Sequence, residues 1–168
     1  EMGLASDKPH QAPQIIYRSH ADNAETVAKA YGVTKDELPY GIGWANETIT
    51  LASHSGCHMD APWHYFPTMN NGEPSRTIDQ VPLEYCFSDG VHLDFSQWDP
   101  RKIIHADDIR RVLDQMEYQL KPLDIVLLES GAAPHFGQPD YTSYGAGVSE
   151  EATVWLMEQG IKVVGTDS

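Results

Sequence analysis

One short segment of the chain gathers the side chains best suited to bind a metal ion or to transfer a proton. The eleven residues from His54 to His64 read HSGCHMDAPWH and hold three of the eight histidines, with Asp60 among them. Imidazole nitrogens and carboxylate oxygens bind divalent cations, and both groups also act as general acids and bases. This segment is therefore the first candidate for a functional site.

The spacing of these four polar side chains restricts the backbone that can carry them. All four occupy even-numbered positions, so an extended chain would direct them to one side. In a straight strand, however, His54 and His58 would lie about 13 Å apart, too far for bonds of about 2.1 Å to one ion. A helix is disfavoured because Gly56 and Pro62 would weaken its interior. We therefore expect the backbone to bend within the segment, at Gly56.

These residues predict a metal site with two imidazole ligands and one carboxylate ligand, namely His54, His58 and Asp60. His64 would lie nearby as the group that carries a proton. Two alternatives stay open for His64, which would be a fourth ligand or a hydrogen-bonding support for the loop. For the whole segment the alternative is a polar surface loop. Two nitrogens and one oxygen suit Zn²⁺, and Mn²⁺ is nearly as good a match.

The same segment resembles the signature H-x-G-T-H-x-D-x-P-x-H of the cyclase family of metal-dependent hydrolases, which includes bacterial kynurenine formamidases and isatin hydrolases. Every fixed position matches except Cys57, where the family has threonine, and a weaker similarity extends from about Asn46 to Ser168. This departure keeps the three ligands but places a thiol beside them. The resemblance implies a swivelling β/β/α-like fold and hydrolysis of a carbon–nitrogen bond in an amide, formamide or cyclic amide.

The family pattern also implies residues beyond Ser168, among them a histidine and a glutamate that bind metal in two-metal members. We therefore expect a single domain over residues 1–168 that lacks its C-terminal segment. Alternatively, another chain of a homo-oligomer, a dimer or a tetramer, supplies the missing groups.

The metal site by itself does not define the substrate. An ester hydrolase, a lactonase or a lyase would use the same ligands, and the amide substrate follows only from the resemblance. A rival from another class is a protein that holds a structural metal, or a small ligand, without turnover. A structural zinc site is usually closed by four protein ligands, often cysteines, whereas Cys57 is the only thiol near this segment.

Aromatic residues flank the histidines. Trp63, Tyr65 and Phe66 surround His64, and Trp44 ends the upstream stretch PYGIGW. They would line a pocket for a flat aromatic substrate or cover the hydrophobic core, and both possibilities stay open.

Composition excludes several classes of protein. A formal charge of −14 over 168 residues argues against nucleic acid as a partner, because phosphates attract basic patches. No apolar run approaches the roughly 20 residues of a membrane span, and no secretory signal is visible. Two cysteines make no disulfide framework. We expect a cytoplasmic protein that acts on a small molecule.

Periodicity predicts the elements that position the site. Alternation over residues 47–53 predicts a strand that delivers His54 at its end, and a polar pair, His92 and Asp94, alternates with apolar residues in a strand over 90–95. Apolar runs predict two further strands, both buried, at 124–129 and 161–165. Helices are predicted at residues 22–32, 105–120 and 149–160, the first capped by Asp22. The long loop over 131–147 is a further functional candidate. The fold class is therefore α/β, a mixed β-sheet with packed helices, with the metal site near the carboxyl edge of its strands.

Overall fold

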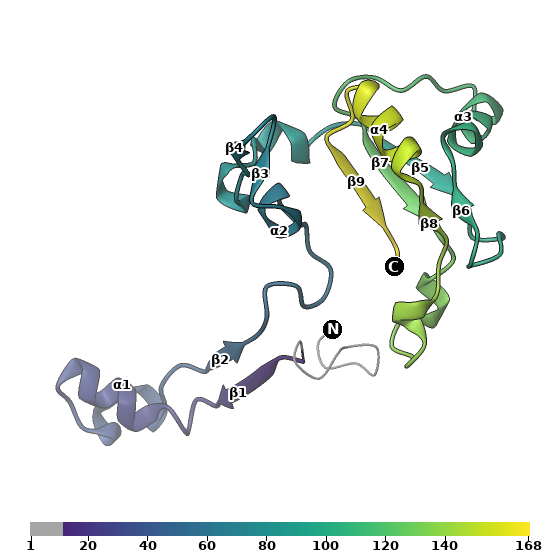
Figure 1. Ribbon diagram of the computed structural model, residues 1–168. Helices are drawn as coiled ribbons and strands as arrows, with labels where there is room; N and C mark the ends of the chain where they lie inside the picture. The colour runs from purple at the N-terminus through teal and green to yellow at the C-terminus, as the bar shows by residue number, and fades with distance from the viewer. Residues whose placement is uncertain (1–11) are drawn as a thin grey trace. The chain divides into compact units, whose positions relative to one another are not determined.

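The computed structural model describes residues 12–168. The polar sequence with Pro9 and Pro13 predicts an irregular lead-in over residues 1–14, most of which lies outside the described residues. The described chain forms two compact units, one ending at His58 and the other spanning Met59–Ser168 (Figure 1). Across residues 12–168, no helix combines the length and the apolar character that crossing a bilayer requires.

The first unit is built on an antiparallel pair of strands. Strand β1 (Gln14–Arg18) pairs with β2 (Asn46–Thr50), so that the first residue of β1 lies opposite the last residue of β2. The chain between them carries helix α1 (Ala24–Tyr31) and two single 3₁₀ turns, which Figure 1 shows beyond one end of the β1–β2 pair. These turns are η1 (Lys35–Glu37) and η2 (Pro39–Gly41).

Helix α1 confirms the predicted helix but not its predicted cap. Its buried face contains Ala24, Val27 and Ala28, and Gly32 ends it with φ 68°, a conformation that glycine adopts at little cost. The predicted cap at Asp22 is wrong, because this carboxylate accepts hydrogen bonds from the backbone and hydroxyl of Ser19 at 3.0 and 2.6 Å. The next residue, Asn23, occupies the cap position instead.

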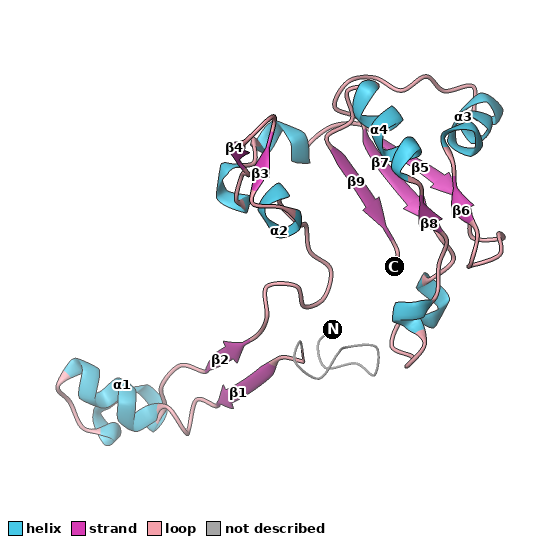
Figure 2. Ribbon diagram, viewed as in Figure 1, coloured by secondary structure: helices cyan, strands magenta, loops and turns pink. Residues whose placement is uncertain are grey.

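The second unit contains a three-stranded parallel sheet in the order β5-β7-β9 (Figure 2). Its strands and the two helices that pack against it are β5 (Gly90–Asp94), α3 (Ala106–Gln115), β7 (Ile125–Glu129), α4 (Glu150–Glu158) and β9 (Val163–Thr166). The predicted order of a strand over 124–129, a helix over 149–160 and a strand over 161–165 indicates a β-α-β unit. This unit is confirmed, because β7 and β9 are parallel neighbours joined through α4.

The hydrophobic core lies between this sheet and its helices. Alternate strand residues face the core, as the period of two predicts, and one stripe of each helix meets them. The core residues include Val91, Leu93, Phe95, Ile104, Ile109, Leu113, Val126, Leu128, Leu156 and Ile161.

Helix α4 begins and ends close to the predicted positions, whereas α3 is shorter than predicted. Ser149 caps α4 by accepting a hydrogen bond from the N–H of Ala152 at 3.1 Å. The predicted helix to residue 120 is wrong beyond Gln115, because Glu117 adopts φ 54°, which stops an α-helix. Leu120 nevertheless packs against the core from the segment that follows.

Short elements complete the second unit. Asn70, Asn71 and Gly72 all have positive φ and turn the chain between the first two of the short strands given below. The short elements are α2 (Pro62–Tyr65), β3 (Thr68–Met69), β4 (Glu73–Pro74), η3 (Ile78–Gln80), η4 (Leu83–Cys86), β6 (Ile103–Ile104), η5 (Ala133–His135), η6 (Tyr141–Ser143) and β8 (Gly147–Val148). With helices packed on a parallel sheet and an antiparallel pair elsewhere, the α/β class is confirmed.

Candidate metal centre

The histidine-rich segment follows strand β2, but not directly. The strand ends at Thr50, so the prediction that it continues to residue 53 and delivers His54 at its end is wrong. Thr50 pairs with Gln14, and the residue before Gln14 is Pro13, which has no N–H to extend the ladder. The candidate ligands therefore lie on irregular backbone.

The predicted bend at Gly56 is present. Gly56 has φ 70°, in the left-handed region that residues with a Cβ rarely adopt. A Cβ placed there would meet no atom within 4 Å, so the site needs glycine for its backbone conformation and not for space. This bend allows residues four apart in the chain to approach each other.

The two histidines on either side of the bend are in contact. Nδ1 of His54 lies 3.0 Å from Nε2 of His58, and their rings meet edge to face with centroids 5.0 Å apart. Nδ1 of His58 also donates to the carbonyl oxygen of Gly56 at 2.8 Å. A ring nitrogen that donates to a backbone carbonyl fixes the tautomer of a histidine and leaves the other nitrogen to bind a metal.

His54, His58 and Asp60 form the one group of three potential metal ligands found among residues 12–168. Each offers one ligand atom, and these atoms all lie within 4.8 Å of one another. Bonds of about 2.1 Å place two ligands of one ion at most about 4.2 Å apart, so small side-chain rotations suffice to close the group. Two imidazoles and one carboxylate are also the donor types that catalytic zinc sites use. The residues present fit a divalent ion.

His64 lies beside the same carboxylate without belonging to the group of three. Its Nε2 is 3.9 Å from Oδ2 of Asp60. The expectation that proline disfavours a helix throughout this segment is wrong at its end, because Pro62 is the first residue of α2. Proline is favoured at that position, where the missing N–H has no partner to lose. His64 follows Asp60 by four residues, and the helical turn of α2 directs its imidazole toward the Asp60 carboxylate.

Tyr65, the last residue of α2, donates a hydrogen bond from its hydroxyl to Oδ2 of Asp60 at 3.1 Å. Partial burial of the hydroxyl raises the pKa of Tyr65, and the hydrogen bond and the negative charge of Asp60 raise it further. The Tyr65 ring also meets that of His64 edge to face, with centroids 5.0 Å apart. Sequence reasoning grouped this residue with the aromatic pocket and missed its polar contact.

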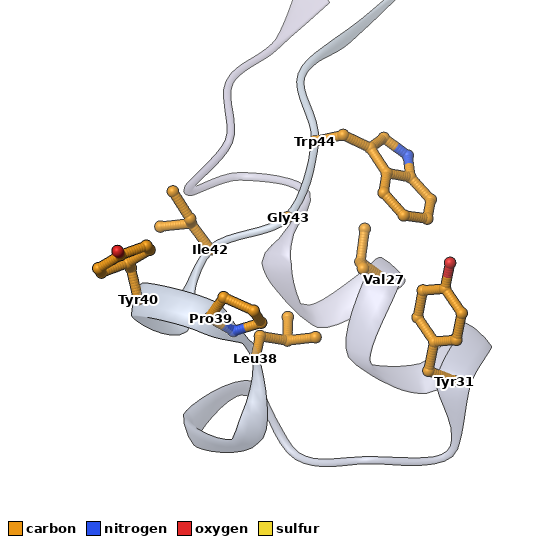
Figure 3. A pocket seen from close by; sticks show the side chains of 8 residues that line it. All are labelled: Val27, Tyr31, Leu38, Pro39, Tyr40, Ile42, Gly43 and Trp44. Atoms are coloured by element: carbon orange, nitrogen blue, oxygen red, sulfur yellow. The ribbon is translucent and has the colours of Figure 1, made fainter.

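The other predicted pocket residues remain exposed. Trp63 and Phe66 are 55% and 64% exposed and lie outside the core cluster, so the alternative that they cover the core finds no support. Trp44 borders a hollow of about 360 Å³ in the first unit, where its ring meets that of Tyr31 edge to face (Figure 3). The lining is Val27, Tyr31, Leu38, Pro39, Tyr40, Ile42, Gly43 and Trp44. A substrate-pocket role for these aromatic residues stays a prediction.

The polar pair on β5 separates into two interactions. Nε2 of His92 lies 2.9 Å from Oε2 of Glu129 on the neighbouring strand β7. Asp94 instead accepts a hydrogen bond from the N–H of Ser96 at 2.8 Å, and its hydrogen bonds with Ser96 lower the pKa of the carboxyl. Glu129 was not predicted, because only the register of β5 and β7 brings it to His92.

The long loop after β7 is held by Asp167, beyond the end of β9. Its carboxylate accepts hydrogen bonds from the N–H and hydroxyl of Ser130 at 2.6 and 2.7 Å and from the N–H of Ala133 at 2.9 Å. Burial opposes ionisation, but these hydrogen bonds outweigh it and hold the pKa of Asp167 below its usual value of 3.8. The hydroxyl of Tyr141 donates to the Asp167 carbonyl at 2.8 Å.

Comparison with known proteins identifies related chains. Residues 7–168 match the model of the family described as "Putative cyclase". A kynurenine formamidase from Bordetella petrii is 30% identical over 162 residues, which cover 88% of this chain and 68% of that enzyme.

Solved structures of similar fold include an isatin hydrolase bound to the product analogue thioisatinate, with a TM-score of 0.71 and 17% identity over 99% of this chain. Isatin hydrolase A from Ralstonia solanacearum has a TM-score of 0.69 and 18% identity over 93% of this chain. The chain spans 63% and 56% of these two structures, respectively, so it covers less than two thirds of their length.

Proposed function

The chain belongs to the cyclase family, and from this premise we propose that the protein is a metal-dependent hydrolase of a carbon–nitrogen bond in a small amide, formamide or cyclic amide. The observation that carries the proposal is the convergence of His54, His58 and Asp60 within 4.8 Å on one bent segment. The substrate class is supported by the names of the relatives, a kynurenine formamidase and isatin hydrolases.

We assign the metal to His54, His58 and Asp60 and favour Zn²⁺ or Mn²⁺. A divalent ion, when bound, supplies Lewis acidity that activates water at neutral pH and polarises a carbonyl group. The protein contributes the orientation of the ligands. Gly56 bends the backbone, and its carbonyl oxygen accepts a hydrogen bond from Nδ1–H of His58. The lone pair of the His58 ring is therefore on Nε2, the nitrogen that would bind the metal.

We assign proton transfer to His64. Its Nε2 would accept the proton of the attacking water and return it to the leaving nitrogen. Two observations support this division of roles: His64 lies outside the group of three ligands, and its Nε2 lies 3.9 Å from Oδ2 of Asp60. The exposed rings of Trp63 and Phe66 beside it would contact a flat aromatic substrate.

The remaining expectations are part of the same proposal. We further propose a small-molecule substrate, a cytoplasmic location and a homo-oligomer. The acidic composition supports a small molecule as the partner in place of a nucleic acid. No nucleic-acid or membrane partner is proposed.

Turnover of aryl formamides and cyclic amides by metal-loaded protein tests the function, with chelator-treated protein as the control. We expect turnover that the chelator removes and that added Zn²⁺ or Mn²⁺ restores. Stoichiometric metal binding without turnover of either substrate class would instead favour the non-catalytic rival.

A further inference from the structure

We infer that Tyr65 is a positioning residue for Asp60, whose hydroxyl holds the carboxylate in the orientation in which it binds the metal. The inference rests on the proposed function, because it concerns the same metal site. It differs from the sequence-based expectation, in which the Tyr65 ring lined the substrate pocket.

The contact itself restricts the carboxylate. The phenol donates to Oδ2 of Asp60 at 3.1 Å, while Oδ1 is buried from solvent. A hydrogen bond to one oxygen limits rotation of the carboxylate about its terminal bond, so both oxygens keep a defined direction. Metal-ligating carboxylates are commonly oriented by such outer hydrogen bonds, and their loss weakens metal binding by about 10- to 100-fold.

The backbone around Tyr65 makes this contact a built feature of the fold. Helix α2 begins at Pro62, whose carbonyl accepts the N–H of Phe66 at 3.2 Å after one turn. The N–H of Trp63 donates to the carbonyl of Arg76 at 3.0 Å, which ties the turn to the segment after β4. One fixed helical turn therefore brings the Tyr65 hydroxyl back to a residue five positions earlier.

Tyr65 also contacts the proposed proton carrier. Its ring meets the ring of His64 edge to face at 5.0 Å, while its hydroxyl is bonded to Asp60. A single side chain thus touches the ligand that would hold the ion and the histidine that would move the proton.

Replacement of Tyr65 with phenylalanine tests the inference, because it removes only the hydroxyl. Affinity for Zn²⁺ and Mn²⁺ is measured by competition with a chromophoric chelator. We expect Tyr65→Phe to weaken binding by about 10- to 100-fold. The matched control is Tyr17→Phe on β1, which removes the same atom from a tyrosine that is 71% exposed, close to the 73% of Tyr65. We expect the control to leave metal affinity unchanged.

Each outcome of this experiment is decisive. If the unaltered protein binds metal and Tyr65→Phe binds it equally well, the inference is wrong while the metal site stands. If the unaltered protein binds no metal, the proposed site fails and the inference fails with it. The Michaelis constant for an aryl formamide, measured at saturating metal, gives a further check. A raised constant with unchanged metal affinity would make Tyr65 a substrate contact and overturn the positioning role.

Discussion

Nδ1 of His58 donates a hydrogen bond to the carbonyl oxygen of Gly56, two residues earlier, at 2.8 Å. Because a carbonyl oxygen only accepts, the proton resides on Nδ1, and a neutral ring then carries its lone pair on Nε2. That nitrogen lies 3.0 Å from Nδ1 of His54. One glycine thus bends the backbone and selects the tautomer of the histidine that follows.

The first prediction concerns Gly56→Ala. Alanine at φ 70° costs roughly 1–2 kcal/mol, and no neighbouring atom lies within 4 Å to add a clash. If the bend is needed for the bound state, this strain should weaken metal affinity by about tenfold, as titration with Zn²⁺ would measure. Gly90→Ala is the control, because its Cβ would also enter open space and its φ lies outside the strained region. Equal metal affinity in both variants would contradict a role for the bend.

The second prediction separates His58 from His64. His58→Ala removes a proposed ligand, so metal affinity and turnover should fall together. His64→Asn should keep its metal and lose turnover by about a hundredfold or more, the usual effect of removing one general acid–base group. Metal stoichiometry and turnover are measured on the same samples. Loss of metal from His64→Asn would identify a fourth ligand, and unchanged turnover would identify a supporting residue.

The third prediction concerns pH and Asp167. Its pKa in the folded protein lies below 3.8, so its hydrogen bonds stabilise the fold above that pH and lose this effect as the pH falls through the folded pKa. Asp167→Asn should reduce the free energy of unfolding by about 1–2 kcal/mol at pH 7, and the difference should shrink toward pH 2. Urea unfolding across this range measures it. A difference that stays constant down to pH 2 would show that the charge of Asp167 is not responsible.

The fourth prediction concerns Asp124, which lies directly before β7 and is 1% exposed. Its carboxylate accepts hydrogen bonds from the Tyr118 hydroxyl and the Lys121 N–H, both at 2.9 Å. Asp124→Ala leaves these donors unpaired and should lower the free energy of unfolding by about 1–3 kcal/mol. Asp114→Ala, on the exposed side of α3, should change it by less than about 0.5 kcal/mol. Comparable losses in both variants would contradict this account of Asp124.

The sequence predicted the elements with strong periodicity. The strand around Val91 appears where alternation places it, and the helix around Ile109 appears where the helical stripe places it. The strand around Val126 appears where the apolar run over residues 124–129 places it. The ends of the elements were harder to predict than the elements themselves, because an end depends on the backbone conformation of a single residue, such as the positive φ of Glu117. Strand β1 was not predicted, because its residues are mostly exposed and follow no clear alternation.

In the candidate site, too, sequence patterns predicted some features and missed those that depend on the local backbone. The ligand types and the bend at Gly56 followed from composition and spacing. The contact of Tyr65 with Asp60 was missed because the helical turn that creates it starts at Pro62, which we treated as a reason against helix. Proline as the first residue of a turn was the available signal. His92 and Glu129 are 37 residues apart, and their pairing depends on the register of two strands, which a single sequence does not reveal.

The most direct test of the proposed metal site is a calorimetric titration of Zn²⁺ into chelator-stripped protein. We expect saturable binding of one ion per chain, and we expect it to be abolished when His54, His58 and Asp60 are replaced together by alanine. Far-ultraviolet circular dichroism of the triple variant would verify that it is folded. The absence of saturable binding, or binding that survives in the folded triple variant, would contradict the assignment of this segment as the metal site.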